Sequence, residues 1–355
     1  MSLTGGAFLS TLIALCVLAV AATVLLAPRI PGPRPVAVLG RVVLVAFCQL
    51  VAVATVAVWI NNSFGLYTSW SDLLGTGAQT ATGPMAGPPE RTATFSPGPA
   101  GGVLQTYVRG DASKLAGQVL VWTPPEYGQA RYRHTRFPVL TLLHGVPGSP
   151  ETWTDVGGMP QAVQQLLSAG RIRPFILVMP TIDPGGVNTD CSDVGSTRTA
   201  TWLTHDVPTL VDRHFRTLTT ARSRALLGYS TGGFCAVKLP LQYPGVYATG
   251  AAMSPDPLDG DPDVLPDPPV RARNSPQELI RRSHPPVALY LATTDQDRNS
   301  RPADLRRFQR AARGPTRVST LVLPTGGHNF GTWQQMYATL LPWISARLTG
   351  AATPR

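Results

Sequence analysis

Residues 225–238 read ALLGYSTGGFCAVK and hold the most informative motif of the chain. An apolar run ends at Gly228, and Ser230 stands between that glycine and Gly232. This spacing is typical of a sharp turn from a strand into a helix, because the glycines leave room for tight backbone while the serine hydroxyl is held at the carboxyl edge of a sheet. We therefore predict a nucleophile elbow, with Ser230 as the nucleophile.

The alternative for this motif is a glycine-rich turn with an incidental serine, since the chain is rich in glycine. The flanking residues favour the elbow. Residues 223–227 are typical of a buried strand, and apolar residues recur at helical spacing after the serine until Pro244 and Gly245 end the run.

Composition divides the 355 residues into an apolar beginning and a polar remainder. Residues 1–60 are almost wholly apolar, and the rest is rich in proline and arginine, which indicates a membrane segment followed by a soluble domain. The net charge of +10 comes almost entirely from arginine, because Lys114 and Lys238 are the lysines. These arginines are scattered rather than interleaved with aromatic residues, so we expect surface charge and no nucleic-acid partner.

Two apolar stretches, 5–27 and 36–60, are long enough to cross a bilayer as helices. A cleaved signal peptide is the alternative for the first, but it lacks a basic start and its apolar run is too long. Arg29, Arg34 and Arg41 cluster at the connection, which the positive-inside rule puts in the cytoplasm. We expect a two-helix membrane hairpin in the cell membrane and an extracytoplasmic domain.

The stretch 61–102 is expected to be a juxtamembrane segment and linker. Phe64, Tyr67 and Trp70 are spaced for one face of a short interfacial helix, although an unstructured tether fits equally well. The catalytic domain is then 103–355.

From residue 115 onward, apolar runs alternate with helical segments, which favours a mostly parallel sheet with flanking helices. Strands are expected at 118–122, 139–143, 175–179, 223–227, 248–253, 287–292 and 318–323, and helices at 159–169, 201–215, 302–312 and 332–348. Between two of these strands, the proline-rich and aspartate-rich stretch 254–286 is expected to be an insertion that forms a lid or a wall of the substrate site.

An activated serine needs a base and an acid that orients the base. His328 lies in a loop directly after the last expected strand, which places it at the same sheet edge as Ser230. The acid should follow the preceding strand, where the sequence offers Asp295 and Asp297. We assign it to Asp295, which comes first after the strand, and expect Asp297 to point along the loop to solvent.

Backbone N–H groups are expected to bind the negative oxygen of the tetrahedral intermediate. One is the amide of Thr231, directly after the nucleophile. The other is the amide of Val146 in the segment HGVPG, since Pro147 has no N–H. His144, at the start of this segment, is expected to have a structural role.

Four motifs in order, HGVPGS, GYSTGG, ATTDQD and GGHNFGTW, resemble the "putative esterase" branch of the α/β-hydrolases, which includes feruloyl esterases, S-formylglutathione hydrolases and mycolyltransferases. The resemblance covers about residues 103–348. It implies an α/β-hydrolase fold, a triad of Ser230, Asp295 and His328, and an oxyanion hole made by the amides of Val146 and Thr231. The mycolyltransferases differ from this chain in the oxyanion loop.

The cysteines divide by position. Cys16 and Cys48 fall within the apolar spans and are expected to be small apolar residues. Cys191 lies in a loop and Cys235 lies one turn into the helix after Ser230, so we predict a disulfide between them, with two buried thiols as the alternative. No residue spacing suggests a metal site, and no cofactor is expected.

Three functions follow from these observations. The first is a membrane-anchored serine esterase that hydrolyses a small-molecule, lipid or sugar ester through an acyl-serine intermediate. The second is an acyltransferase that hands the same acyl group to a sugar or lipid of the cell envelope. The third is an inactive hydrolase domain that serves as a binding module, which an intact triad disfavours.

Overall fold

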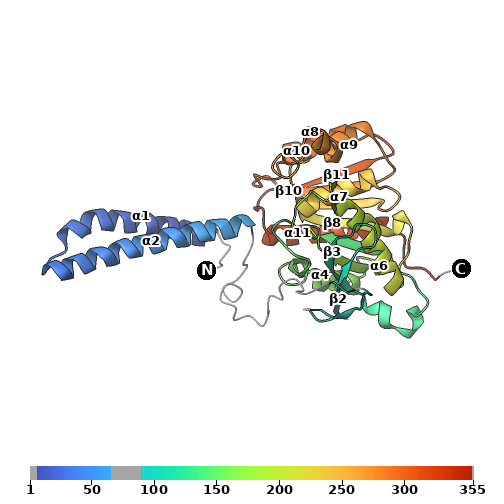
Figure 1. Ribbon diagram of the computed structural model, residues 1–355, viewed down its shortest axis with the longest axis horizontal. Coiled ribbons are helices and arrows are strands. Elements are labelled where there is room, and N and C mark those ends of the chain that lie inside the picture. The colour runs from blue at the N-terminus through green and yellow to red at the C-terminus, as the bar shows by residue number, and fades with distance from the viewer. Residues whose placement is uncertain (1–5, 65–88, 91, 99, 354–355) are drawn as a thin grey trace. The chain divides into compact units, whose positions relative to one another are not determined.

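The computed structural model describes residues 6–64, 89–90, 92–98 and 100–353. These residues form two units (Figure 1). The first contains an N-terminal pair of helices and is grouped with residues 327–331, and the second is the rest of an α/β domain. Residues 65–88 lie outside the described part of the chain, and with them the interfacial helix that we expected to include Tyr67 and Trp70.

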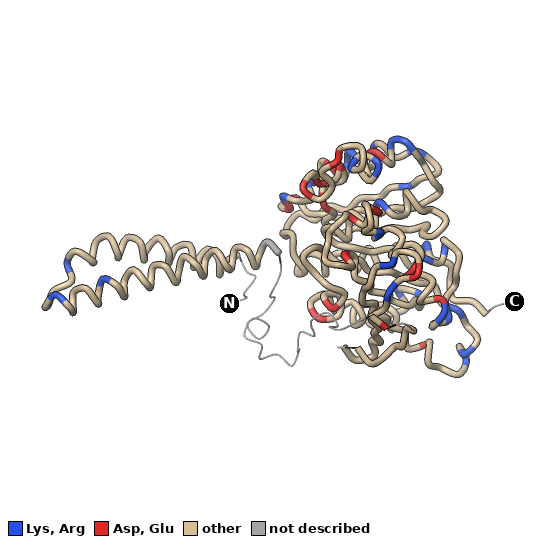
Figure 2. The backbone as a smooth tube through the Cα atoms, in the orientation of Figure 1, with Lys and Arg blue, Asp and Glu red and all other residues tan. Residues whose placement is uncertain are grey.

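The first unit contains α1 (Gly6–Leu26) and α2 (Arg34–Phe64), which pack against each other. Both helices are candidate membrane spans by their length and apolar composition. Large apolar side chains of both are exposed, which suits a lipid environment. The basic residues of this unit lie near the connection between the two helices (Figure 2), where the Arg41 side chain donates a hydrogen bond to the backbone oxygen of Ala27.

Nine strands of the described chain form one sheet in the second unit. They are β1 (Ser96–Pro97), β2 (Val103–Arg109), β3 (Ala116–Trp122), β4 (Val139–Leu143), β5 (Ile176–Pro180), β8 (Arg224–Ser230), β9 (Thr249–Pro255), β10 (Ala288–Thr294) and β11 (Arg317–Leu323). Their order is β1-β2-β3-β5-β4-β8-β9-β10-β11. The strands from β5 to β11 pair in parallel, and β1, β2 and β3 add antiparallel pairs at one end.

The parallel register brings the carboxyl ends of the central strands to one edge of the sheet. Leu143 of β4 pairs with Gly228 of β8, and Thr294 of β10 pairs with Leu323 of β11. Between them, Ser230 at the end of β8 pairs with Pro255 of β9 after an irregularity in the register. Loops that follow these strands therefore meet at the edge where α/β folds place their ligand sites.

Helices cover both faces of the sheet. They are α4 (Met159–Ser168), α5 (Thr199–Thr201), a π-helical turn (Trp202–Asp206), α6 (Val207–His214), α7 (Thr231–Gln242), α10 (Pro302–Ala311) and α11 (Phe330–Arg347). Val119 and Val121 of β3 share a buried cluster with residues of α6 and α7. Leu120 between them is also buried but lies outside that cluster, because successive residues of a strand point to opposite faces.

The stretch that we expected to be an insertion is packed into the domain. It contains α8 (Pro268–Asn274) and α9 (Pro276–Arg282), and α9 packs against α7 and α10. Leu258 and Ile280 of this stretch are buried in the main hydrophobic cluster. In Figure 1 the three helices α8, α9 and α10 gather at the β10–β11 end of the sheet.

The sequence missed the first strands and one helical irregularity. Strand β2 reads VLQTYVR, and polar residues at several positions make its apolar pattern weak, although it pairs with both β1 and β3. β1 lies inside the stretch that we expected to be linker. The helix expected at 201–215 is present, but its first part is a π-helical turn.

Candidate active site

The turn from β8 into α7 holds Ser230 in a rare backbone conformation. Its φ is 54° and its ψ is −125°, a combination that costs a non-glycine residue free energy. The backbone after this serine is closely packed, because a Cβ atom at Gly232 would lie 2.1 Å from the backbone oxygen of Leu143 and 2.3 Å from that of His144. The glycine two residues after the serine therefore lets α7 start directly against the end of β4.

The loop after β4 lies beside the same turn. A Cβ atom at Gly145 would come within 3.2 Å of the Ser230 Cβ and within 2.8 Å of the Tyr229 ring. The next residue in this loop is Val146, whose amide we expected in the oxyanion hole. The amide of Thr231 belongs to the first turn of α7, where backbone N–H groups have no partner within the helix.

His144 holds the start of this loop and is fully buried. The backbone N–H of Ile182 donates to Nε2 of His144 at 3.1 Å, so the ring proton lies on Nδ1, which donates to the backbone oxygen of Gly145 at 2.7 Å. Burial lowers the pKa of His144, which keeps the ring neutral. These bonds join the loop after β4 to the loop after β5.

Aromatic rings pack beneath the turn. The Tyr229 ring stacks on Trp333 with a centroid distance of 4.5 Å and meets Trp153 edge to face at 5.1 Å. Burial raises the pKa of the Tyr229 phenol to about 12, so the side chain stays protonated. Trp153 comes from the loop after β4, and Trp333 comes from α11. Their contacts with Tyr229 therefore join this loop and α11 to the end of β8.

Asp256 contacts the predicted nucleophile, and sequence reasoning missed it. The Ser230 hydroxyl donates to Oδ1 of Asp256 at 3.0 Å, and the Thr231 hydroxyl donates to Oδ2 at 2.6 Å. The backbone N–H of Asp256 donates to the Ser230 backbone oxygen at 3.2 Å. We had assigned this aspartate to the insertion. The signal that identifies it is its position, one residue after the strand that pairs with β8.

The two aspartates after β10 lie in different environments. Asp295 is exposed, whereas Asp297 is 3 % exposed and accepts hydrogen bonds from the backbone N–H groups of Asn299 and Ser300, both at 3.0 Å. Our expectation that Asp297 points to solvent is therefore wrong. The loop turns back on itself because this side chain binds the backbone two and three residues further on.

His328 lies in the loop between β11 and α11. The chain just before it is held at the sheet edge, because the Thr294 hydroxyl donates to the Gly326 backbone oxygen at 2.6 Å and the Gly326 N–H donates to the Gln296 side chain at 3.1 Å. The chain just after it is held by Trp333, which stacks on Tyr229.

A disulfide joins Cys191, in the loop after β5, to Cys235 of α7. Beside it, the buried ammonium group of Lys238 donates to the backbone oxygen of Asp190 and, at 2.7 Å, to the Ser192 hydroxyl. Burial lowers the pKa of Lys238 to about 7 and raises that of Asp190 to about 6. The loop after β5 is thus attached to the elbow helix by a covalent bond and by a buried polar network.

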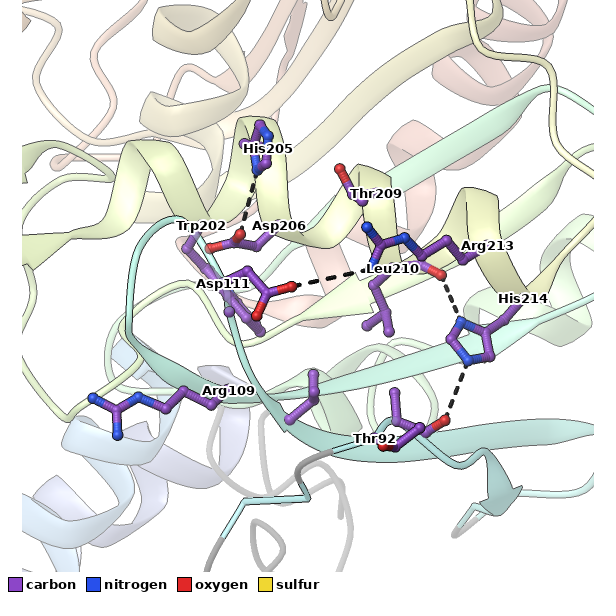
Figure 3. Close-up of a pocket in the computed structure, with 13 residues that line it drawn as sticks. Thr92, Arg109, Asp111, Trp202, His205, Asp206, Thr209, Leu210, Arg213 and His214 are labelled. Atoms are coloured by element: carbon purple, nitrogen blue, oxygen red, sulfur yellow. Dashed lines mark hydrogen bonds and ion pairs between the residues drawn. The ribbon is translucent and has the colours of Figure 1, made fainter.

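A separate cavity of about 550 Å³ lies between the β2 end of the sheet and α6 (Figure 3). It includes none of the site residues expected from the sequence. Asp206 on its wall accepts hydrogen bonds from the Ala112 and Ser113 backbone N–H groups at 2.9 and 2.8 Å. Burial alone would raise the pKa of Asp206, but these hydrogen bonds outweigh burial and hold the pKa below its usual value.

No group of three or more His, Cys, Asp or Glu side chains is placed to hold a metal ion in the described part of the chain. The groups that could take part in a reaction near Ser230 are its own hydroxyl, the Asp256 carboxylate and backbone N–H donors.

Comparison with known proteins identifies the family and the fold of the chain. Residues 116–344 match the model of the family described as "Putative esterase". A ferulic acid esterase superposes with a TM-score of 0.58 at 20 % identity, over 69 % of this chain and 97 % of that protein. An S-formylglutathione hydrolase from Agrobacterium tumefaciens gives 0.58 at 18 % identity, over 72 % and 99 %. The domain therefore has the α/β-hydrolase fold.

Among curated proteins, an uncharacterized protein of Corynebacterium glutamicum is 24 % identical over 256 residues, which are 65 % of this chain and 58 % of that protein. The chain thus spans less than two thirds of the length of the curated relatives that it matches. Since the family model matches more than half of the 355 residues, the chain belongs to the putative esterase family.

Proposed function

We propose that this protein is a membrane-anchored serine esterase that hydrolyses carboxylic esters outside the cytoplasm through an acyl-serine intermediate. The observation that carries the proposal is the backbone of Ser230, whose φ of 54° holds the side chain at the carboxyl edge of the sheet, next to Gly145. Strain of this kind gathers at functional sites. Membership of the esterase family supports the same type of reaction.

In the proposed mechanism, Ser230 Oγ attacks the carbonyl carbon of the ester, and His328 takes the serine proton. The amides of Val146 and Thr231 donate to the oxygen that becomes negative in the tetrahedral intermediate. His328 then gives the proton to the leaving alcohol. In the second half-reaction a water molecule attacks the acyl carbon, His328 takes a proton from that water, and the proton passes to Ser230 Oγ as the acyl group leaves.

His328 is supported as the base by the chain on either side of it. Gly326 is bonded to the end of β10, and Trp333 stacks on the residue that precedes Ser230. Both ends of the loop that carries His328 are therefore attached at the carboxyl edge of the sheet, which is where this architecture requires the base.

For the acid, we transfer the proposal from Asp295 to Asp297. A carboxylate that orients the base works best when it is shielded from water and held by further hydrogen bonds. Asp297 meets both conditions, whereas Asp295 is exposed. Asp295 stays the alternative, and a pair of substitutions separates the two.

The proposed membrane anchor is the pair of helices α1 and α2. Its support is their length, their apolar composition and the exposure of their large apolar side chains. The cluster of Arg29, Arg34 and Arg41 near the connection favours a cytoplasmic connection, which leaves the α/β domain outside.

The test is hydrolysis of a chromogenic ester, together with labelling by a fluorophosphonate probe. We expect Ser230→Ala to abolish both, since only the nucleophilic oxygen is lost, and to leave the unfolding temperature close to that of the wild type. Ser168→Ala, at an exposed serine at the end of α4, is the matched control and should behave as the wild type. Labelling that persists in Ser230→Ala would assign the nucleophile to another residue.

A further inference from the structure

The carboxylate of Asp256 lies against the hydroxyl that the proposed reaction acylates. Its Oδ1 accepts the Ser230 hydroxyl proton at 3.0 Å, while its Oδ2 accepts from the Thr231 hydroxyl at 2.6 Å and its backbone N–H donates to the Ser230 carbonyl at 3.2 Å. Asp256 is partly exposed, so solvent and small molecules reach it. In the described part of the chain it forms no ion pair.

The local backbone is shaped to bring Asp256 to this position. The pairing of β8 with β9 is irregular between Tyr229 and Ser230, and Ser254 adopts a φ of 44°. A serine in the left-handed region is uncommon and is retained where the surrounding structure enforces it. The end of β9 is thus bent so that the residue after Pro255 reaches the elbow.

Acylation changes the partners of this carboxylate in a defined way. A bond forms between Ser230 Oγ and the acyl carbon, the bond from that carbon to the leaving oxygen breaks, and the serine proton departs with the alcohol. The acylated Oγ has no proton to donate. Oδ2 and the backbone of Asp256 keep their bonds to Thr231 and Ser230, so the carboxylate stays in place while Oδ1 loses its donor.

A carboxylate oxygen without a donor, about 3 Å from an ester oxygen, is an unfavourable arrangement that a hydroxyl donor relieves. We propose that in the acyl-enzyme Asp256 Oδ1 accepts a hydrogen bond from one O–H of the water that releases the acyl group and places its oxygen next to the acyl carbon, while the second O–H of that water is left for His328. This inference rests on the proposed serine esterase function. It assigns to Asp256 a role in the second half-reaction.

The same geometry sets the expected effect on the first half-reaction. In the free enzyme the Ser230 hydroxyl donates to Asp256, so this carboxylate competes with the base for the serine proton. Loss of Asp256 therefore removes a competitor for that proton and should leave acylation unchanged or faster. Deacylation, in contrast, loses the group that orients the acceptor.

The experiment is stopped-flow hydrolysis of a p-nitrophenyl ester by the full-length protein, with wild type, Asp256→Ala and Asp256→Asn. The burst of p-nitrophenol reports acylation, and the steady-state rate reports deacylation. We expect Asp256→Ala to keep its burst rate within about threefold of the wild type, or to exceed it, while deacylation falls by about 10- to 100-fold, the range for one charge-assisted hydrogen bond. Intact-mass spectrometry should then find the acyl-enzyme accumulating.

The Asn variant keeps the size of the side chain and one acceptor oxygen, so its deacylation rate should lie between those of the wild type and Asp256→Ala. It also gives a result if the Ala variant fails to fold. The matched control is Asp263→Asn, an exposed aspartate in the same connection, which should keep both rates.

Two results would overturn the inference. One is an equal fall of both rate constants in the Asp256 variants, which would make Asp256 a part of the proton-transfer machinery or of the fold. The other is unchanged deacylation. Failure of the underlying function looks different, because the wild type itself would then show neither turnover nor a covalent acyl group.

Discussion

Asp295 and Asp297 are two residues apart, yet their surroundings predict very different effects on turnover. Asp297 is buried and bonded to two backbone N–H groups, and Asp295 is exposed. We expect Asp297→Asn to lower kcat by roughly 10⁴, as removal of the orienting carboxylate does in a comparable triad, with little change in KM. Asp295→Asn should lower kcat by less than about tenfold.

The measurement is steady-state kinetics of both variants with one chromogenic ester, accompanied by circular dichroism to show that each is folded. A larger loss of kcat in Asp295→Asn would return the acid to the position that we first chose from the sequence. It would leave the proposed roles of Ser230 and His328 unchanged.

At the scale of single residues, the sequence was informative where chemistry depends on local spacing. The pattern around Ser230 is complete within five residues, so the strained turn was predictable. The burial of Asp297 was not predictable, because it depends on a loop that folds back on its own side chain. The contact between Asp256 and Ser230 was also not predictable, because it depends on how the end of β9 bends beside β8.

The start of α7 is held by close backbone contacts, which predicts a large effect of a small substitution. Gly232→Ala places a Cβ atom 2.1 Å from the Leu143 backbone oxygen, so either the helix or β4 has to move. We expect it to destabilise the domain by about 2 kcal/mol or more, the range for an overpacked core site. Thermal unfolding followed by circular dichroism checks this.

The matched control is Gly245→Ala. At this position a Cβ atom meets nothing within 4 Å, and the substitution should change the free energy of unfolding by less than about 0.5 kcal/mol. If the two variants are equally stable, the close approach of α7 to β4 is not a feature of the folded protein.

The buried Lys238 of α7 predicts a pH dependence of stability with a definite sign. Burial lowers its pKa to about 7, whereas a lysine in an unfolded chain titrates near 10.4. Between these values the unfolded chain binds a proton that the folded chain lacks, so the free energy of unfolding rises with pH. We expect the wild type to gain stability between pH 7 and pH 9 relative to Lys238→Met.

The two proteins share all other titratable groups, so the difference between their pH dependences of stability reports Lys238. The measurement is the unfolding temperature of each protein at pH 7 and at pH 9. The same pH dependence in Lys238→Met and in the wild type would mean that Lys238 titrates normally. Asp190 acts with the opposite sign at lower pH, because burial raises its pKa to about 6.

At the scale of elements, periodicity predicted the parallel strands and most helices to within a few residues. It failed for β2, whose polar positions weaken the pattern, and for β1, which is two residues long. The π-helical turn inside the helix expected at 201–215 has no local signal, since it depends on a hydrogen-bond register that helical spacing does not specify.

For the whole molecule, the proposed arrangement is a membrane hairpin with its connection inside and the α/β domain outside. Protease added to intact cells should then cut between the two units and release the domain, while a cytoplasmic protein stays whole. The physical reason is the basic cluster near the connection between α1 and α2. Cleavage only after lysis would reverse the orientation.

The central claim is that the chain forms a covalent acyl group on Ser230. The most direct measurement is to mix the full-length protein with a p-nitrophenyl ester, quench it in acid within the first turnovers, reduce it and map its tryptic peptides by mass spectrometry. Trypsin cuts after Arg224 and Lys238, so residues 225–238 are released as one peptide. We predict the added acyl mass on Ser230 of that peptide. An acyl group on another residue, or rapid turnover with no acyl-enzyme at any quench time in either the wild type or Asp256→Ala, would contradict the claim.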